Sequence, residues 1–329
     1  MSYTSAHATP ASPGNHRTAF GTLAVLLALA FGAAWMLLED LATERHLAHV
    51  RQDVDQRLAA LRDRVGAEIR GDLLALRGLV SVIHLHPDLD QAQFERAAQP
   101  LFDGTTNLRN IAGAPDMVIR LMTPLAGNEK AVGLDYRRTP SQASAAEWAR
   151  LARGIVVAGP LDLVQGGQGL IARVPVYLPQ PDGGERFWGL VSAVIDIDKL
   201  YDASGLRDPD LPIEVAIRGR DASGSAGPVF FGRSEVFDGP AAVQDIELPL
   251  GSWHMAAAPR GGWPSSAPDA GPLRLGLTLA ALLVFGALAM AQRAARQSSR
   301  AHAHAQAAER QVTSLIENAP DAMLIIDDV

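Results

Sequence analysis

Two long apolar runs dominate the hydrophobic pattern of this chain, one near each end. They cover residues 19–38 and 273–291. A helix needs roughly 20 residues, at a rise of ~1.5 Å each, to cross a bilayer. The pattern therefore predicts two transmembrane helices that flank a folded segment of residues 39–272.

A long helical stripe follows the first run. Apolar residues recur at gaps of three and four from Leu47 to Val80, and no proline interrupts them. This spacing predicts a stalk helix over residues 39–84, continuous with the first transmembrane helix. The stripe fits a core helix of its own domain, or a stalk whose N-terminal half pairs with a second copy of the chain. Both interpretations hold if they apply to different halves of the helix, and we expect a homodimer through the stalk and the transmembrane helices.

Shorter runs follow in residues 85–206. Asp90 is a typical N-cap for a short helix that reaches Leu101, and Pro140 and Gly154 bracket a helix over Ser141–Arg153. Four apolar runs predict strands: Met117–Met122, Ala131–Asp135, Leu170–Tyr177 and Phe187–Ile197. This order predicts one mostly antiparallel sheet with helices on its side, a subdomain distal to the membrane.

A second and smaller set of strands is expected in residues 207–260. It comprises Ile213–Arg218, Val229–Gly232 and Asp245–Ala257, with Gly219–Pro228 as a hairpin loop. Residues 261–272 are rich in glycine, proline and serine, and we interpret them as a connector to the second transmembrane helix. The predicted fold class is thus α+β, with a long N-terminal helix and two antiparallel-sheet subdomains between two transmembrane helices.

The two ends of the chain complete this organisation. Residues 1–18 form a short tail, and residues 292–317 are polar and alanine-rich with apolar residues at helical spacing, which predicts a linker helix. Residues 318–329 have the pattern of a turn and a first strand. Because one strand is not a domain, we expect the natural protein to continue beyond Val329.

Charge and composition narrow the setting. The chain has 329 residues, a net charge of −7, 5% aromatic residues and no cysteine. Absence of cysteine excludes disulfides and thiolate metal sites, and without a basic stripe the acidic chain is not expected to bind nucleic acid. The first apolar run exceeds the ~7–15 residues of a signal-peptide core, which favours an uncleaved anchor over a signal peptide.

Arginines set the expected orientation. Arg293, Arg296 and Arg300 follow the second run, whereas Glu39 and Asp40 follow the first. The positive-inside rule then places both termini in the cytoplasm. Richness in alanine, arginine and glycine suggests a bacterial source, so we expect a two-pass protein of the inner membrane with residues 39–272 in the periplasm.

Candidate sites for chemistry are few. His84, His86, Asp88 and Asp90 have ligand types that suit a divalent metal, but Pro87 breaks any strand there and the aspartates are explained as caps. We therefore predict no metal. Residues 165–169 have a glycine-rich sequence that suits an anion-binding loop or, more simply, a tight turn. Asp196 and Asp198 are typical of a cap at a strand end. No Ser/His/Asp or Cys/His arrangement is evident, so we predict neither a catalytic site nor a cofactor.

The strongest constellation is GNEKAVGLDYRR, residues 127–138. Asp135 follows apolar residues, where an ionised carboxylate needs hydrogen-bond partners. It is either a structural aspartate paired with Arg137, Arg138 or Arg173, or a contact for a ligand.

These residues also carry a family resemblance. GNEKAVGLDYRR, VVAGPLDLVQGGQGLIARVPVY and FWGLVSAVIDIDKL resemble, in order and spacing, three blocks of the CHASE domain over about residues 75–205. That family comprises extracytoplasmic sensory domains of histidine kinases and cyclases, including the cytokinin receptors of plants. The final residues, LIENAPDAMLIIDDV, resemble the opening of a PAS domain.

The resemblance implies a long helix and two PAS-like subdomains, with a small-molecule pocket in the distal one. By position, Asp135 matches the aspartate that receives the polar edge of a ligand, and Val157 matches a residue that offers backbone hydrogen bonds. We add Tyr136, Lys130, Arg120 and Arg173 as candidates for the pocket lining.

The expected function is that of a ligand-sensing and signal-transducing module without a catalytic site of its own. The parent protein is expected to be a sensor histidine kinase or, alternatively, a diguanylate cyclase. Two alternatives stay open: a sensor of a periplasmic protein partner, and a membrane-tethered periplasmic enzyme.

Overall fold

The computed structural model describes residues 15–102, 106–163, 166–268 and 270–317. Most of the predicted N-terminal tail and the predicted PAS start at residues 318–329 lie outside the described residues. The chain divides into two compact units, one formed by residues 1–47 with 264–329 and the other by Ala48–Trp263. Each unit has its own architecture.

The first unit consists of two long apolar helices. The N-terminal part of α1 (Asn15–Leu85) and α5 (Ala270–Glu317) are both long and apolar enough to cross a membrane. Phe31 and Phe285 lie with their ring centroids 6.3 Å apart, and Arg274 forms an ion pair with Glu39. Leucines of both helices remain exposed to the surroundings, as expected of helices that meet lipid.

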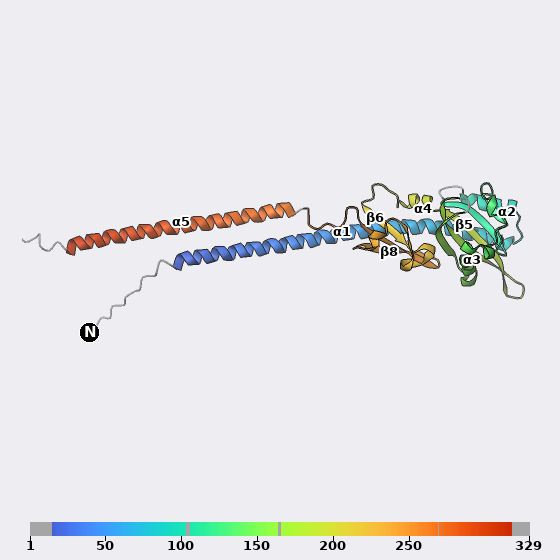
Figure 1. The fold of residues 1–329 in the computed structure, drawn as a ribbon, viewed down its shortest axis with the longest axis horizontal. Coiled ribbons are helices and arrows are strands. Elements are labelled where there is room, and N and C mark those ends of the chain that lie inside the picture. The colour runs from blue at the N-terminus through green and yellow to red at the C-terminus, as the bar shows by residue number, and fades with distance from the viewer. Residues whose placement is uncertain (1–14, 103–105, 164–165, 269, 318–329) are drawn as a thin grey trace, which may run out of the picture. The chain divides into compact units, whose positions relative to one another are not determined.

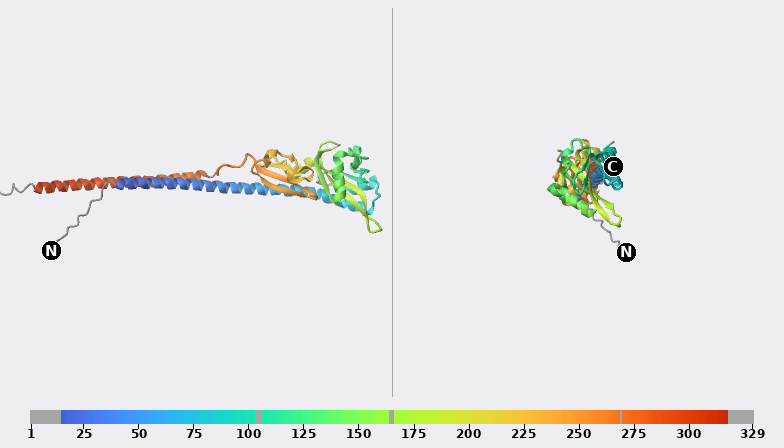
Figure 2. Two further views of the ribbon diagram at one scale, coloured as in Figure 1. Left: turned by 60° about the horizontal axis from the view of Figure 1, so that its bottom comes forward. Right: turned by 90° about the vertical axis from the view of Figure 1, so that its right-hand side faces the viewer.

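The second unit is built around the C-terminal part of α1. One face of this helix is buried at every third or fourth residue, at Val54, Leu58, Leu61, Val65, Ile69, Leu73, Leu76, Leu79 and Ile83. Two antiparallel sheets lie along this part of the helix (Figures 1 and 2), and the buried stripe belongs to one core with residues of both sheets. The predicted stripe therefore does face a core of its own domain.

The distal sheet has five strands in the order β2-β1-β5-β4-β3, all antiparallel. Its strands are β1 (Leu108–Pro115), β2 (Leu121–Thr123), β3 (Val156–Asp162), β4 (Gln168–Pro179) and β5 (Glu185–Asp196). Helices α2 (Gln91–Ala98) and α3 (Pro140–Ala152) flank it, with the 3₁₀ turns η1 (Gln99–Phe102), η2 (Glu129–Ala131) and η3 (Tyr136–Arg138). Helix α4 (Ile197–Ser204) leads to the second sheet.

The proximal sheet has four strands in the order β7-β6-β9-β8. They are β6 (Ile213–Arg218), β7 (Val229–Phe231), β8 (Ala242–Leu248) and β9 (Gly251–Pro259). Three 3₁₀ turns, η4 (Arg220–Ala222), η5 (Gly224–Ala226) and η6 (Ser234–Phe237), connect them. Trp253 is fully buried and packs edge-on against Phe230, with ring centroids 5.0 Å apart, between this sheet and the helix core.

Several predicted element boundaries are wrong. Ala131–Asp135 is not a strand: it starts at the last residue of η2, has Gly133 at φ +90°, and forms an isolated bridge, Val118–Asp135, with the preceding segment instead of a ladder. The run Asp245–Ala257 is two strands, because the chain turns between Leu248 and Gly251, whose φ of +115° suits glycine. Strands β1 and β3 were not predicted.

The physical reason for the two missed strands is local composition. β1 contains Asn110, Gly113 and Pro115, which are poor strand formers, and β3 contains Gly159-Pro160. β3 tolerates the proline because it is an edge strand with an irregularity between Ala158 and Leu161.

The predicted helix caps are confirmed. Asp90 and Gln93 form a reciprocal capping box at the start of α2, and Asp196 accepts hydrogen bonds from the backbone N–H groups of Asp198 and Lys199 at the start of α4. Asp196 and Asp198 are thus explained by local structure rather than by catalysis.

A polar cluster joins α1 to the first strand of the distal sheet. The Asn107 amide donates to Glu68 (2.8 Å) and to the buried Asp72 (3.3 Å), and the Thr106 hydroxyl donates to Asp72 (3.1 Å). Burial raises the pKa of the Asp72 carboxyl. Because hydrogen bonds are directional, this cluster fixes the position of the start of β1 along the axis of α1.

Truncation of the buried face of α1 should destabilise the second unit. Leu61→Ala removes a side chain with no exposed surface and leaves a cavity, which typically costs about 2–5 kcal/mol. We expect a clear fall in the denaturation midpoint of the full chain in detergent, followed by circular dichroism. Leu85→Ala, on the same helix but 76% exposed, is the matched control and should change the midpoint little. Equal effects of the two substitutions would contradict the assigned helix face.

Candidate functional site

The two faces of the distal sheet differ in what they contact. Alternate residues of β4 and β5, such as Ala172 and Val191, belong to the core that contains the buried face of α1. The residues between them, such as Ile171, Arg173 and Ser192, point to the opposite face. The candidate site lies on this second face.

An irregular segment covers the second face. Residues 117–119 pair with residues 133–136 through three backbone bonds, from Ile119 N to Leu134 O, from Gly133 N to Ile119 O and from Tyr136 N to Met117 O (2.8–3.0 Å). η3 and α3 follow directly, with Pro140 at the start of α3. This pairing holds Tyr136 over the sheet, and α3 places Gln142 beside it.

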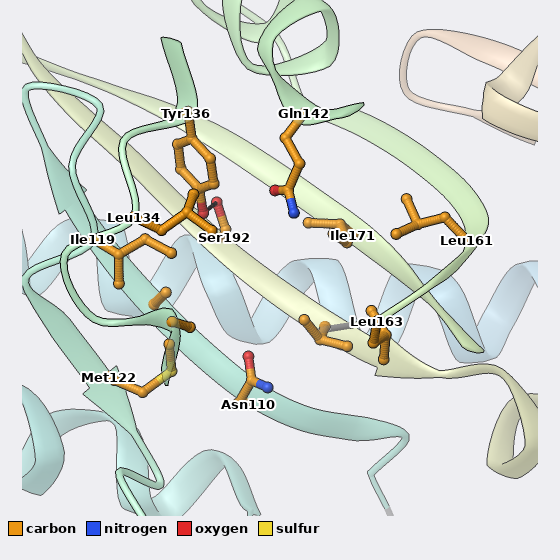
Figure 3. A pocket seen from close by; sticks show the side chains of 13 residues that line it. Asn110, Ile119, Met122, Leu134, Tyr136, Gln142, Leu161, Leu163, Ile171 and Ser192 are labelled. Atoms are coloured by element: carbon orange, nitrogen blue, oxygen red, sulfur yellow. Dashed lines mark hydrogen bonds between the residues drawn. The ribbon is translucent and has the colours of Figure 1, made fainter. Parts of the chain in front are cut away.

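A small cavity remains between this cover and the sheet (Figure 3). Its volume is about 50 Å³. The lining is mostly apolar, with four polar side chains, and consists of Asn110, Ala112, Ile119, Met122, Ala131, Leu134, Tyr136, Gln142, Leu161, Leu163, Ile171, Ser192 and Val194. Such an apolar pocket with a few convergent polar groups is the usual form of a small-molecule site.

The polar lining residues are held by hydrogen bonds. The Tyr136 hydroxyl donates to Ser192 Oγ at 3.0 Å, and both residues are buried. Asn110 donates through Nδ2 to Asn128 Oδ1 at 2.9 Å, and Gln142 Oε1 accepts from Arg173 at 2.9 Å. Figure 3 shows Tyr136 and Gln142 reaching toward the cavity from the cover and Asn110 from the sheet.

Burial sets the protonation of these groups. It raises the pKa of the Tyr136 hydroxyl, which therefore stays a neutral donor. Burial lowers the pKa of the Arg173 guanidinium. Arg173 has no exposed surface, and its guanidinium carbon lies 5.4 Å from the centre of the Tyr136 ring.

The structure brings together two of the six predicted site residues. Tyr136 lines the cavity, and Arg173 contacts the lining residues Tyr136 and Gln142. Lys130 and Arg120 are exposed and lie outside the lining. The Val157 side chain packs in the core on the α1 side of the sheet, and its strand pairs with β4 at Ala172.

Asp135 is bound to a neighbour instead of facing the cavity. Its carboxylate accepts from Arg137 Nε and from a terminal guanidinium nitrogen, each at 2.9 Å, and from the Arg137 backbone N–H. Of the pairings left open for Asp135, the structure has the one with Arg137. A ligand-binding role for Asp135 stays a prediction.

Three polar lining residues, Asn110, Gln142 and Ser192, were missed by the sequence analysis. Ser192 interrupts an otherwise apolar buried strand, and that was a usable signal. Gln142 sits in the first turn of a helix and Asn110 in an unrecognised strand, where nothing local marks either residue as facing a cavity.

The other sequence candidates have structural explanations. Both ring nitrogens of His84 lie near backbone carbonyl oxygens, those of Val80 (2.8 Å) and Tyr177 (3.0 Å). Among the described residues, no group of His, Asp and Glu side chains is arranged to hold a metal ion. Residues 166–167 form a turn against Leu163, in which Gly166 N donates to Leu163 O; Gln165 lies outside the described residues.

Comparison with known families identifies this segment. Residues 76–231 match the CHASE domain family, a span that runs from the C-terminal end of α1 to β7. These residues form a CHASE domain. The match extends beyond the predicted 75–205 into the proximal sheet, so the CHASE domain includes the whole distal sheet and strands β6 and β7 of the proximal sheet.

This chain is also similar to part or most of several solved structures. They include an extracellular ligand-binding receptor from Desulfohalobium retbaense (14% identity, TM-score 0.45, covering 64% of this chain and 40% of that one). They also include the ligand-binding domain of the Pseudomonas aeruginosa amino acid chemoreceptor PctC in complex with GABA (16% identity, TM-score 0.46, covering 62% of this chain and 98% of that one). A third is the ligand-binding domain of the Campylobacter jejuni chemoreceptor Tlp3 in complex with L-norvaline (11% identity, TM-score 0.45, covering 64% of this chain and 91% of that one). Among curated proteins, none matches this chain.

The CHASE domain and the two flanking apolar helices make this chain an extracytoplasmic sensing module of a two-pass membrane protein.

The Asp135–Arg137 pair predicts a specific acid dependence of stability. The Arg137 side chain holds the pKa of Asp135 below its ordinary value of 3.8. The contribution of the pair is therefore present above the unfolded-state pKa and is lost as the pH falls through the lower folded value. Asp135→Asn should flatten the thermal-stability profile of the full chain in this acid range, with a small amplitude because the pair is partly exposed. Asp55→Asn, at an exposed position of α1, is the control; identical profiles for the two variants would contradict the prediction.

Proposed function

We propose that this chain is the sensing and membrane-spanning portion of a receptor that binds a small molecule in the cavity of the distal sheet. The observation that carries the proposal is this cavity within a CHASE domain, where Asn110, Gln142 and Ser192 present polar groups among apolar side chains. The site lies between a regular sheet and an irregular cover, so its walls differ in how easily they move.

The size of the cavity implies that binding changes its shape. About 50 Å³ accommodates one or two water molecules at ~30 Å³ each, whereas ligand pockets typically measure ~300–1,000 Å³. The sheet wall is held by continuous ladders, whereas the cover is held by local turn bonds and by the three backbone bonds between residues 117–119 and 133–136. A ligand therefore selects an arrangement in which the cover has moved outward.

A direct contact relates this site to the proximal sheet. The backbone N–H of Gly159, in β3, donates to Asp221 Oδ1 in η4 at 2.7 Å. Leu161, two residues further along β3, lines the cavity. A displacement of β3 would therefore move η4, in the β6–β7 connection. The coupling free energy between two such sites is typically about 1–3 kcal/mol.

The chain acts as a homodimer in this proposal. The outer face of α1 carries short side chains at Ala67, Gly71 and Gly78 around the exposed Leu74, at alternating gaps of four and three that suit close approach of a second copy. Both termini are cytoplasmic, because arginines follow the second apolar run, and the membrane is the bacterial inner membrane.

The signal passes through α5 to cytoplasmic machinery. We propose that the parent protein is a sensor histidine kinase, with a diguanylate cyclase as the alternative, and that residues 318–329 begin a PAS domain. Helix displacements of ~1–2 Å would carry the signal across the membrane.

A second candidate function is recognition of a periplasmic protein. The outer face of α3 exposes Trp148 (59%) and Leu151 (67%), one turn apart, and large apolar side chains on a surface helix are typical of a partner site. If this is the sensing surface, Trp148→Ser should abolish signalling while leaving small-molecule binding and thermal stability unchanged. Loss of signalling on cavity filling, with Trp148→Ser active, would instead support the small-molecule site.

Filling the cavity should block ligand binding. Ala112→Val adds two methyl groups at a lining position of β1 and should weaken binding of a responsive metabolite by about tenfold or more. Binding is measured by calorimetry of the full chain in nanodiscs against a metabolite library. Ala114→Val is the matched control, because Ala114 is buried on the same face of the same strand but outside the lining. Equal binding by both variants would place the ligand elsewhere.

The dimer is testable because the chain has no cysteine. Leu74→Cys introduces a unique thiol on the outer face of α1, and oxidation of membranes should give a disulfide-linked dimer on a non-reducing gel. Lys199→Cys, at an exposed position of α4, should stay monomeric under the same conditions. Absence of the Leu74→Cys dimer would contradict pairing through this part of the stalk.

A further inference from the structure

Arg173 is a buried guanidinium with too few partners. It lies in β4 with no exposed surface, and one terminal nitrogen donates to Gln142 Oε1 at 2.9 Å. Nε and the other terminal nitrogen have no hydrogen-bond partner among the described residues, although both are buried. A guanidinium offers five N–H donors, so most of its donor capacity is unmet in this structure.

No nearby carboxylate of the described residues balances this charge. Within the described part of the chain, no Asp or Glu oxygen lies within 4.0 Å of the Arg173 guanidinium. Asp221 acts on it electrostatically, but Asp221 Oδ1 accepts from Gly159 N. The Tyr136 ring gives only the partial compensation of a cation–π contact at 5.4 Å.

The position of Arg173 ties it to the cavity. Ile171, two residues earlier on the same face of β4, lines the cavity, and so does Ser192, the register partner of Arg173 on β5. The two side chains that contact the guanidinium, Tyr136 and Gln142, are also lining residues. Displacement of the Gln142 side chain would therefore open Arg173 to the cavity.

An unpaired buried charge is costly, and a buried polar group without a partner in a native fold needs an explanation. Proteins retain such destabilising groups mainly where function requires them. A carboxylate matches the planar fork of a guanidinium and forms two parallel charge-assisted hydrogen bonds with it.

We propose that the ligand of this cavity is a short-chain aliphatic carboxylate whose anionic group replaces Gln142 on Arg173. This inference rests on the proposed small-molecule site and specifies its ligand class. One carboxylate oxygen accepts from the nitrogen that now donates to Gln142, and the other accepts from an unpartnered nitrogen of the same guanidinium. The apolar lining contributed by Ile119, Leu134 and Ile171 surrounds the aliphatic tail, and the small cavity limits its length.

This assignment differs from the one implied by family resemblance. In the site implied by the resemblance, an aspartate receives the polar edge of the ligand, so that ligand is a hydrogen-bond donor or a cation. Here the corresponding Asp135 is saturated by Arg137, and the free charge beside the cavity is positive. The two residues therefore predict ligands of opposite character.

The test is thermal unfolding of the full chain in nanodiscs with a concentration series of formate, acetate, propionate and butyrate. Acetamide and propionamide are the neutral isosteres, sodium chloride controls ionic strength, and phosphate and sulfate test for other oxyanions. Carboxylates should raise the melting temperature in a saturable manner, and the amides and chloride should not. Stabilisation by phosphate or sulfate but not by carboxylates would overturn the assigned class.

Arg173→Met is the decisive variant. It should weaken carboxylate binding by about 10- to 100-fold, the usual range for lost charge-assisted hydrogen bonds. Without ligand it should melt at or above the wild-type temperature, because it removes an unpaired buried charge and keeps the apolar volume. A purely structural arginine would give a lower melting temperature and an unchanged carboxylate response, and that result would overturn the inference.

Two further variants separate the alternatives. Arg186→Met removes an exposed arginine from the same sheet and should leave the carboxylate response intact. Gln142→Ala removes the group that competes for Arg173 and should strengthen carboxylate binding. If neutral metabolites bind, and Ala112→Val but not Arg173→Met blocks them, the carboxylate assignment fails while the proposed function stands. If no compound of either kind binds, both fail.

Discussion

The packing of a single helix face against two sheets is the constraint on which the rest of this structure depends. From Val54 to Ile83, the buried stripe of α1 shares one core with the distal and proximal sheets. Each such side chain contributes about 1.5–3 kcal/mol when it is fully buried. Because the helix occupies one face of the distal sheet, that sheet must be covered on its other face by different means, and those means create the site.

The cover of the second face is less regular than the helix, and this difference has functional consequences. It consists of short backbone pairings, 3₁₀ turns and the start of α3, so it leaves a cavity where a helix would have filled the space. It also leaves Arg173 buried with two unpartnered nitrogens. A fold selected for stability alone would replace that arginine with an apolar residue. Its presence beside a cavity is most simply explained by a ligand that completes it.

Sequence reasoning worked where one physical signal dominated. The stripe of α1, the caps at Asp90 and Asp196, and the strands around Leu170 and Val191 follow from periodicity or from side-chain hydrogen bonding within a few residues. It failed where tertiary context overrode local preference. β1 is a central strand despite its asparagine and glycine, because both of its faces are buried, and β3 retains Pro160 because it lies at an edge. Tyr136 and Arg173 were predicted as pocket residues, whereas Gln142 and Asn110 were not.

By itself the sequence determined the organisation of the protein: two apolar helices, a long stalk and an α+β sensor segment that resembles the CHASE domain. These features depend on the period and length of apolar runs, which are properties of consecutive residues. Only the tertiary structure decided which charged side chains have hydrogen-bond or ion-pair partners. Asp135 and Arg173 both stand in or near apolar runs, but one meets Arg137 two residues away and the other points into a face where no carboxylate of the described residues approaches. That difference depends on which segments the fold brings together across the sheet, and no local pattern encodes it.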